Sequence, residues 1–387
     1  MRLVSNFKKL LVAQFLTAFA DNAILWIAIT WAVVSVDNHS SYVSALQASF
    51  LIAFVVLAPW VGAFADAHAK SKVLVIGNVV KLVGSGLMIF SIDPLIAYAI
   101  VGIGAAIYSP AKYGVIPELV DEKGLVKANG WVEGATIAAI LIGGIVGAKI
   151  ANESISAALW FVVALYVVSA IIAARIGPLQ AIAERKKGYI REFTYVCKTL
   201  IDTRHARFAL IGSALFWASA AVLRVALIAW AQVVLLISDT DKIAELTIFI
   251  SIGIVIGSLL SAKVFRLENL RKTRFAAYAM GVCVLIFSQV DTVIGTWIIL
   301  FLIGAAGGIF IVPINAAIQN IGHKTVGAGG TVATQNFFNN MAMLIASGLF
   351  YASAKAGISP IVSIFATGVL ILLATMVIAM QLRKNQP

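Results

Sequence analysis

The sequence carries little charge. Charged residues make up 12% of its 387 residues, hydrophobic residues make up 61%, and the mean hydropathy is +0.99. A soluble globular protein is expected to carry about 25% charged residues. The composition therefore excludes a soluble globular chain and indicates a protein that lies largely within a lipid bilayer.

Cysteine and histidine are scarce as well. The two cysteines, Cys197 and Cys283, and the four histidines are too few for a disulfide framework or a metal cluster. The sequence also lacks a Gly-x-Ser-x-Gly elbow, a His-Glu-x-x-His motif and a Walker nucleotide loop. We therefore expect neither an enzyme nor an ATP-driven pump, and no metal or other cofactor.

Long apolar stretches are what the sequence has in place of charge. Breaks at charged residues, Pro and Asn or Asp clusters predict twelve spans, each at least as long as the roughly 17 residues that cross the hydrocarbon core. These spans are residues 10–36, 42–64, 72–92, 95–116, 128–151, 155–177, 208–236, 243–264, 274–290, 293–318, 329–354 and 359–381. The sequence therefore predicts an all-α membrane protein with twelve transmembrane helices.

The basic excess is distributed unevenly between the loops. Lys and Arg number 29 against 17 Asp and Glu, and the resulting charge of +12 would indicate a nucleic-acid partner in a soluble protein. Here the loop lysines and arginines gather in the even-numbered connections and at the termini, and the other side holds only Lys149, Lys242 and Lys355. By the positive-inside rule both termini are cytoplasmic, and we expect no nucleic-acid binding.

The longest loop divides the spans into two sets of six. We expect a six-helix bundle over residues 1–177, a cytoplasmic linker over 178–206 and a second six-helix bundle over 207–387. Apolar residues recur at helical spacing in the linker and predict an amphipathic helix on the inner membrane surface: Ile190, Phe193, Val196, Leu200 and Ile201. Two interpretations stay open, a tether between the bundles and a lipid-sensing element.

The two sets of spans also resemble each other. Placing Pro110 on Pro313 aligns the fourth span with the tenth, and Trp31 pairs with Trp230 at nearly the same offset. Two pseudo-symmetric halves of the same orientation are typical of transporters in which rigid bundles rock about a central site. Glycines four residues apart predict close helix contacts: Gly143 and Gly147, Gly253 and Gly257, and Gly304 and Gly308.

Charges inside the spans are candidates for the functional site, because each costs at least about 2.5 kcal/mol at mid-membrane unless it faces water or a partner. Asp21 lies 12 residues beyond Lys9, about 18 Å along a helix. Arg224 lies at similar depth in the seventh span. The two form either a structural ion pair or a site for a zwitterion, with Arg224 on an anion such as phosphate and Asp21, beside Asn22, on an ammonium.

Further polar groups lie in other spans. Lys81, in the third span, is expected on the same cavity, where it supplements Arg224 at a phosphate or snorkels toward the inner surface. Lys112 and Glu133 fall near the inner third and are expected to pair, as a structural bridge or a gate contact, with substrate binding as the alternative.

Four amide side chains crowd the eleventh span: Gln335, Asn336, Asn339 and Asn340. Asn336 and Asn340 are four residues apart and share a helix face. They are candidates for hydrogen bonds to a polar headgroup, and bonding between helices is the alternative.

The loop after the second span carries a recognisable motif. It reads Gly62-Ala-Phe-Ala-Asp66-Ala-His-Ala-Lys70-Ser-Lys72, which resembles the cytoplasmic Gly-x-x-x-Asp-x-x-x-basic-x-basic loop of the major facilitator superfamily. In that family the Asp meets a helix end and basic partners to hold the inner gate shut. The resemblance therefore implies a gating role for Asp66 and Lys70.

Strings along the whole chain resemble one family within that superfamily. Gln14-Phe-Leu-Thr-Ala-Phe-Ala-Asp21-Asn22-Ala, Tyr108-Ser-Pro-Ala-Lys112-Tyr-Gly, Leu125-Val-Lys-Ala-Asn-Gly130 with Glu133, and Leu215-Phe-Trp ahead of Leu223-Arg224 are similar to the bacterial lysophospholipid transporters. The resemblance implies an inner-membrane flippase that brings lysophospholipids, typically lysophosphatidylethanolamine, to the cytoplasmic leaflet. There a lysophospholipid acyltransferase restores the missing chain.

Other functions stay open. A proton-coupled drug or metabolite exporter of the same fold would use Asp21 or Glu133 as the proton carrier. A passive channel or a structural partner of a membrane enzyme would leave the six-plus-six repeat unexplained. A six-plus-six bundle contains its own cavity, so we expect a monomer.

Overall fold

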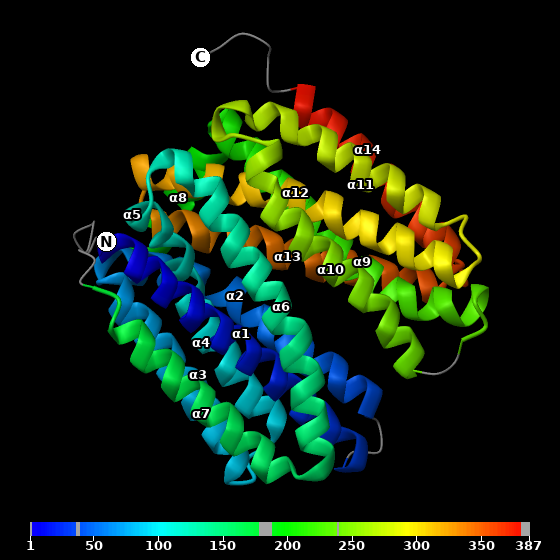
Figure 1. Ribbon diagram of the computed structural model, residues 1–387, viewed down its shortest axis with the longest axis horizontal. Coiled ribbons are helices and arrows are strands. Elements are labelled where there is room, and N and C mark those ends of the chain that lie inside the picture. The colour runs from blue at the N-terminus through cyan, green and yellow to red at the C-terminus, as the bar shows by residue number, and fades with distance from the viewer. Residues whose placement is uncertain (1, 36–38, 178–187, 238–239, 381–387) are drawn as a thin grey trace. The chain divides into compact units, whose positions relative to one another are not determined.

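The computed structural model describes residues 2–35, 39–177, 188–237 and 240–380, and in these ranges all regular secondary structure is helical (Figure 1). Up to the long loop the α-helices are α1 (Arg2–Ser35), α2 (His39–Ala67), α3 (Lys70–Ile89), α4 (Pro94–Gly114), α5 (Ile116–Leu119), α6 (Leu125–Glu153) and α7 (Ile155–Ala174). After it follow α8 (Tyr189–Asp202), α9 (Arg204–Val234), α10 (Thr240–Val264), α11 (Arg274–Phe287), α12 (Val293–Lys324), α13 (Ala328–Lys355) and α14 (Pro360–Met380). Two short 3₁₀ segments, η1 (Glu122–Gly124) and η2 (Leu267–Thr273), precede α6 and α11.

The predicted spans all fall on these helices. Within the described ranges, ten helices are long and apolar enough to cross a membrane. The other two predicted spans coincide with α11, which has only 14 residues, and with α13, which has 28 residues but carries the amide cluster. The predicted span 274–290 is therefore longer than the helix that forms there, whereas the all-helical architecture is confirmed.

The chain packs into two compact units. The first comprises Met1–Glu122, Ala135–Thr199 and Gln319–Phe337, and the second comprises Lys123–Gly134, Leu200–Ile318 and Phe338–Pro387. Each unit combines segments from different parts of the sequence that contact one another. The predicted division into residues 1–177 and 207–387 therefore stays a prediction. The beginning of the predicted linker, residues 178–187, lies outside the described residues.

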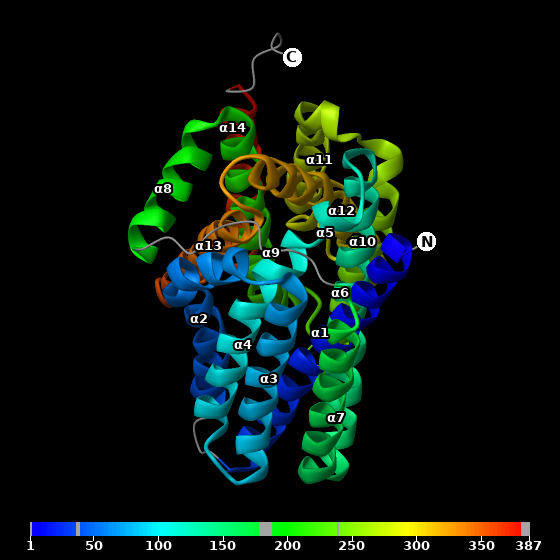
Figure 2. The same ribbon diagram turned by 90° about the vertical axis from the view of Figure 1, so that its left-hand side faces the viewer.

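Four helices of the first unit, α1, α3, α4 and α7, lie side by side (Figures 1 and 2). Glycine allows the close approach of α3 and α4. A Cβ atom on Gly104 would lie 2.6 Å from the Gly77 carbonyl oxygen and 2.6 Å from Cγ of Lys81. Gly104 therefore both brings the helices together and leaves room for a buried lysine side chain.

The predicted glycine contacts are confirmed. In the first unit a Cβ on Gly143 would meet Phe19 of α1, and one on Gly147 would meet Ala23. In the second unit, the four glycines of α10 and α12 face the backbone of the opposite helix. With no side chain at these positions the helix axes approach closely, as small residues permit in membrane helices.

The predicted amphipathic helix is α8. Its buried face contains Val196 and Leu200, with Phe193 half-buried. Ile190 and Ile201 were expected on the same apolar face, but they are 63% and 40% exposed. The α8 helix therefore has a second surface on which apolar side chains are exposed.

Candidate functional site

A buried polar cluster of the first unit surrounds Asp21 on α1. The Lys81 ammonium, on α3, lies 2.7 Å from Oδ2 of Asp21, and the Tyr166 hydroxyl, on α7, donates a 2.7 Å hydrogen bond to Oδ1. Lys81 also donates to Thr17 Oγ1 at 3.1 Å. Its ammonium lies over the rings of Tyr108 and Tyr166, 4.8 and 5.8 Å from the centroids. Four helices, α1, α3, α4 and α7, thus hold one ion pair within an aromatic enclosure.

A chain of hydrogen bonds continues from this pair. Thr17 donates to Oδ1 of Asn78 at 2.8 Å, Asn78 donates to Ser169 at 2.9 Å, and Ser169 donates to the Ala13 carbonyl at 2.8 Å. All three side chains are buried. Because a buried polar group without a partner is costly, this continuity explains how α1, α3 and α7 tolerate polar side chains at membrane depth.

Lys81 does not snorkel. Its side chain is 1% exposed and reaches inward to Asp21 rather than toward the membrane surface. The sequence reasoning placed Lys81 near the same cavity as Asp21 but did not foresee their ion pair or the bond from Tyr166. A lone tyrosine in an apolar span gave no signal, whereas Thr17 and Asn78 were visible as polar residues on neighbouring spans.

Arg224 occupies α9 in the second unit, and its side chain is exposed. Among the described residues its guanidinium has no ion-pair or hydrogen-bond partner. An exposed arginine on a membrane helix is stable where water or an anion solvates it. Asn22, beside Asp21, is half-buried and donates to the Ala18 carbonyl at 2.9 Å within its own helix.

The remaining polar candidates contact other helices. The Asn336 amide of α13 donates to Ser109 of α4 at 2.9 Å, which shows the interhelical alternative for this residue. Asn340 is half-buried one turn further along α13. Asn315 of α12 donates to Oε1 of Glu133 at 3.0 Å.

Lys112 is buried at the C-terminal end of α4. Its ammonium lies 4.0 Å from the ring centroid of Tyr113. The predicted pairing of Lys112 with Glu133 stays a prediction.

A second polar cluster lies where α2 ends and α13 begins. Oδ1 and Oδ2 of Asp66 accept hydrogen bonds of 2.7 Å from the backbone amides of Gly329 and Gly330, in the first turn of α13. The Lys70 ammonium lies 3.1 Å from Oδ1 of Asp66. A carboxylate at a helix N-terminus receives otherwise unpaired N–H groups and the positive end of the helix dipole. This is the geometry that the loop motif implied.

Glycine makes the approach of Asp66 possible. Gly327, just before α13, has φ of +95°, and a Cβ there would lie 2.6 Å from Oδ2 of Asp66. Neither the left-handed backbone nor the short separation suits a residue with a side chain. The sequence showed the glycines, but nothing in it indicated that they face Asp66.

A third cluster on the same side is exposed. Oε2 of Glu122 lies 2.9 Å from the Lys324 ammonium, and Oε1 accepts a 2.7 Å bond from Asn320. Sequence reasoning missed this pair, since alternating charges in loops are common. The described residues contain no group of three His, Cys, Asp or Glu side chains able to hold a metal ion.

Comparison with known proteins identifies the family of the chain. Residues 10–349 match the Major Facilitator Superfamily. The chain belongs to the Major Facilitator Superfamily. It is 39% identical over 363 residues to "Lysophospholipid transporter LplT" of Escherichia coli O1:K1 / APEC, covering 92% of this chain and 90% of the relative. The protein of the same name from Photorhabdus laumondii subsp. laumondii is 37% identical over 367 residues, covering 93% and 91%.

Solved structures show the same superfamily fold. The Escherichia coli fucose:proton symporter FucP superposes with a TM-score of 0.77 at 13% identity, covering 99% of this chain and all 100% of that one. A bacterial homologue of the iron transporter ferroportin gives 0.75 at 15% identity, covering 97% and 99%. Superfamily membership makes the chain a multi-pass membrane transporter rather than an enzyme.

Proposed function

We propose that this protein is a lysophospholipid flippase. It moves single-chain phospholipids, typically lysophosphatidylethanolamine, from the outer to the cytoplasmic leaflet of a bacterial inner membrane by alternating access. The observation that carries the proposal is the identity of 37–39% with proteins named lysophospholipid transporter, over more than nine-tenths of this chain. A likeness that spans nearly all helices supports the same cargo better than a likeness confined to one bundle would.

Charged side chains inside spans supply the headgroup chemistry. Arg224 binds the phosphate, because the guanidinium presents a fork of donors that matches two phosphate oxygens. Its exposed, unpaired state among the described residues supports this role. Asp21 binds the ammonium of the headgroup, with Asn22, Asn336 and Asn340 as neutral hydrogen-bonding groups.

Lys81 has a different role from the one that the sequence left open. It already neutralises Asp21 at 2.7 Å. Before the headgroup arrives, Lys81 therefore holds the carboxylate in position. Because Asp21 remains 17% exposed while Lys81 is 1% exposed, the carboxylate is the member of the pair that a substrate ammonium reaches.

The Asp66 cluster acts as the inner gate. Closing it brings the carboxylate onto the first turn of α13, and opening it removes two charge-assisted hydrogen bonds from Asp66. Lys70 keeps the carboxylate in place from α3. Lys112 and Glu133, on α4 and α6, complete the gate contacts.

The orientation in the membrane follows from the charge distribution, and the partner enzyme follows from the cargo. Both termini lie in the cytoplasm, because the basic loops lie on their side. The protein works as a monomer. Its product is a lysophospholipid in the inner leaflet, which a cytoplasmic-side acyltransferase uses to rebuild a two-chain lipid.

Reconstituted vesicles test the proposal. Purified protein is placed in vesicles with fluorescent lysophosphatidylethanolamine in one leaflet, and inward movement is followed by the loss of label accessible to an external quencher. We expect faster movement than in protein-free vesicles, and loss of that difference in Arg224→Ala and Asp21→Asn. The matched control is Lys127→Ala, which removes an exposed lysine on α6.

Two results would overturn the proposal. Wild-type protein that leaves lysolipid movement at the protein-free rate rejects the cargo. Normal movement in both charge-removing variants rejects the headgroup site. A pH change inside the vesicles on substrate addition, without lysolipid movement, would instead favour the proton-coupled exporter.

A further inference from the structure

The α8 helix carries two faces with different surroundings. The first is docked: the Phe193 ring packs edge-on against Phe337 of α13 with centroids 5.4 Å apart, and Val196 is 3% exposed. The second consists of Ile190, Arg191, Thr194, Tyr195 and Lys198, which are all exposed. These five positions follow the i, i+1, i+4, i+5, i+8 spacing of one helix side, which we call the outer face of α8.

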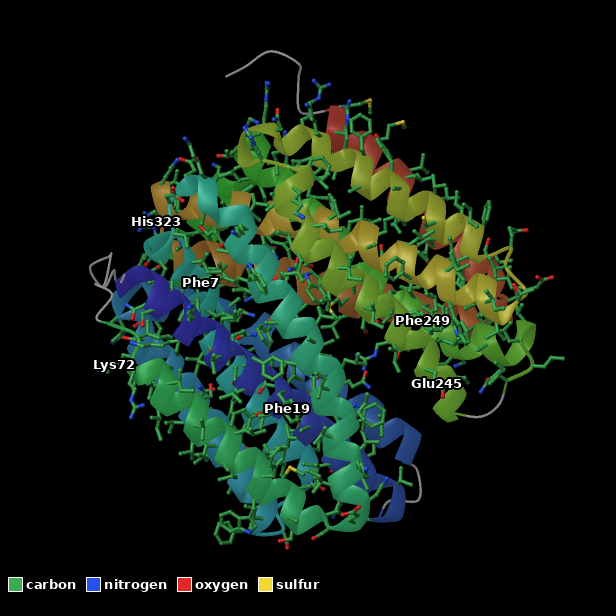
Figure 3. All side chains as sticks on the ribbon, viewed as in Figure 1. Phe7, Phe19, Lys72, Glu245, Phe249 and His323 are labelled. Atoms are coloured by element: carbon green, nitrogen blue, oxygen red, sulfur yellow. The ribbon has the colours of Figure 1, made fainter. Side chains whose placement is uncertain are left out.

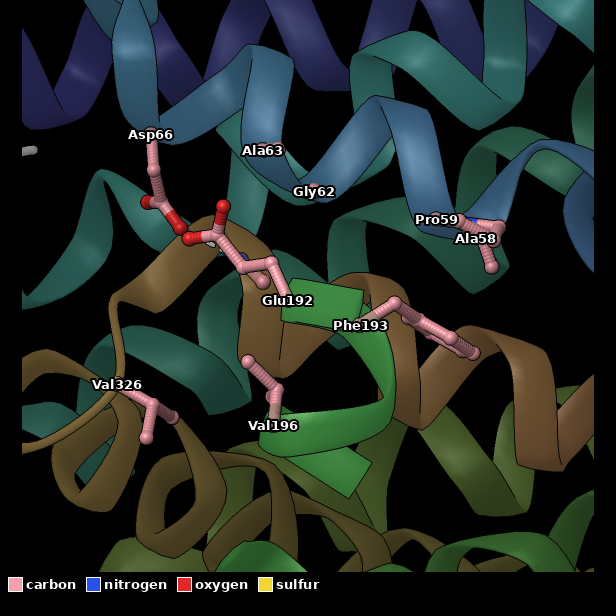
Figure 4. Close-up of a pocket in the computed structure, with 10 residues that line it drawn as sticks. Ala58, Pro59, Gly62, Ala63, Asp66, Glu192, Phe193, Val196 and Val326 are labelled. Atoms are coloured by element: carbon pink, nitrogen blue, oxygen red, sulfur yellow. Dashed lines mark hydrogen bonds between the residues drawn. The ribbon is translucent and has the colours of Figure 1, made fainter. Parts of the chain in front are cut away.

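The docked face lies against membrane helices. Glu192, Phe193 and Val196 line a small pocket together with residues of α2 and α13 (Figure 4). Figure 4 also shows the carboxyl groups of Glu192 and Asp66 pointing toward one another. The α8 helix is therefore attached beside the Asp66 cluster and is not a loose connection.

The pocket places α8 at a definite depth. Its lining runs from Ala58 to Asp66 on α2, which ends at Ala67. Nine residues of helix correspond to about 13 Å, whereas the headgroup layer on each side of the hydrocarbon core is only about 5–8 Å thick. With the end of α2 at the cytoplasmic surface, as the loop charges predict, this lining reaches past the headgroup layer, and we infer that α8 lies beside the headgroups and the first acyl carbons.

The chemistry of the outer face fits that depth. Ile190 and Tyr195 are 63% and 62% exposed, which is unfavourable against water but suits the acyl boundary. Tyrosine is enriched at membrane interfaces, where its ring and hydroxyl face different surroundings. Among these five residues the charged ones, Arg191 and Lys198, are both positive, and the exposed acid Asp202 lies one turn beyond Lys198, at the last residue of the helix.

We propose that the outer face of α8 is a binding site for the anionic phospholipid surface of the cytoplasmic leaflet. Ile190 and Tyr195 enter the acyl boundary, and Arg191 and Lys198 bind lipid phosphates. Each basic residue near an anionic surface strengthens such attraction by about fivefold. Since the docked face contacts α2 and α13 beside Asp66, the same helix connects the lipid surface to that cluster.

Spin-label accessibility tests the site without any transport assay. The label is placed by Thr194→Cys in a Cys197→Ser, Cys283→Ser background, so that Ile190 and Tyr195 are kept. The reference label is Lys72→Cys, at the exposed, outer edge of α3 (Figure 3). In vesicles of phosphatidylcholine with phosphatidylglycerol we expect the label at 194 to be accessible to oxygen and the label at 72 to the water-soluble nickel reagent.

Charge reversal separates a lipid surface from other occupants. Arg191→Glu with Lys198→Glu should move the label at 194 toward the nickel reagent, whereas Lys72→Glu should leave it in lipid. Accessibility of the label at 194 to the nickel reagent in every vesicle would overturn the proposal. If the label at 194 stays in lipid both without phosphatidylglycerol and after charge reversal, the assignment to an anionic surface is overturned.

A second measurement needs no substitution. Amide hydrogen exchange across residues 189–202 of the wild-type protein is compared in nanodiscs with and without phosphatidylglycerol. Slower exchange with the anionic lipid is expected. Exchange that is identical in the two lipids would contradict the proposal even if the labelled variants failed to fold.

Discussion

The ammonium of Lys81 and the carboxylate of Asp21 lie 2.7 Å apart but are unequally buried, at 1% and 17% exposure. The lysine is enclosed by Tyr108 and Tyr166, and the acid is the side of the pair that remains accessible. This difference in burial determines how much stability the protein loses when either partner is removed.

Removing the acid should destabilise the protein more than removing the base. Asp21→Asn leaves a fully buried ammonium without a counter-charge, which costs about 3–5 kcal/mol. Lys81→Met leaves a carboxylate that still has the Tyr166 hydroxyl and some access to water, so the loss should be smaller. The apparent midpoint of thermal unfolding in detergent measures both.

The double variant provides the check. Asp21→Asn with Lys81→Met removes both charges, so its loss of stability should be clearly less than the sum of the two single losses. Lys127→Met, on an exposed lysine, should change the midpoint very little. Additive losses would show that the two residues do not act as a pair.

Gly327 should not tolerate a side chain, and backbone strain is only part of the reason. Gly327→Ala places a methyl group 2.6 Å from Oδ2 of Asp66 at a positive φ, so both strain and the lost Asp66 contacts lower stability. We expect about 2–4 kcal/mol, combining roughly 1 kcal/mol of left-handed strain with the loss of charge-assisted hydrogen bonds.

A matched glycine measures the backbone strain by itself, so the contribution of the Asp66 contacts follows by difference. Gly357 also has a positive φ, +78°, but a Cβ there would have nothing within 4 Å. Gly357→Ala should therefore show the strain alone, about 1 kcal/mol. Equal losses of stability in the two alanine variants would mean that the approach of Asp66 to α13 contributes nothing.

The exposed Glu122–Lys324 pair should contribute little. Both side chains are more than half exposed, 52% and 55%, although the N···O distance is 2.9 Å. Surface pairs of this kind contribute little to stability, because water screens the two charges, and salt weakens them further. Lys324→Ala should shift the unfolding midpoint far less than Asp66→Ala, and raising the salt concentration should abolish even that shift. A shift as large as that of Asp66→Ala would be inconsistent with solvent screening.

The sequence predicted the fold better than it predicted the contacts. Hydropathy and loop charges located the long helices because a bilayer demands long apolar helices and penalises charge, although the predicted span 274–290 is longer than α11. The same penalty marked Asp21, Lys81 and Arg224 as unusual. It could not show which of them pair, because depth along a helix does not give the direction in which a side chain points.

The contacts that sequence reasoning missed depend on backbone geometry. Asp66 is held by the amides of Gly329 and Gly330, and backbone amides leave no trace in residue chemistry. The loop motif pointed to Asp66 only through a family resemblance. On α8, helical spacing gave the helix but grouped Ile190 with Val196, because the spacing alone does not show which neighbours cover each side.

Arginine at position 224 should be required for its shape as well as its charge. Arg224→Lys keeps the charge but replaces a planar fork with a single ammonium, so it loses the two-point grip on phosphate. We expect a raised KM for lysolipid movement and partial retention of the maximal rate, with a greater loss in Arg224→Ala. A phosphate-free single-chain amphiphile should compete poorly in the wild-type protein. Full activity of Arg224→Lys would contradict a bidentate role.

Cys197 reports whether α8 is docked. Burial raises the pKa of its thiol, so less thiolate is present at neutral pH and alkylation should be slow. In a Cys283→Ser variant, labelling of Cys197 by a maleimide should accelerate as the pH rises through 8 and 9. Phe193→Ala removes the ring that packs on Phe337, so α8 should undock and labelling at pH 7 should become faster. Tyr195→Ala is the matched control on the outer face, where loss of a ring leaves the docked contacts intact. If both alanine variants label at the wild-type rate, the Phe193 contact does not hold α8 in place.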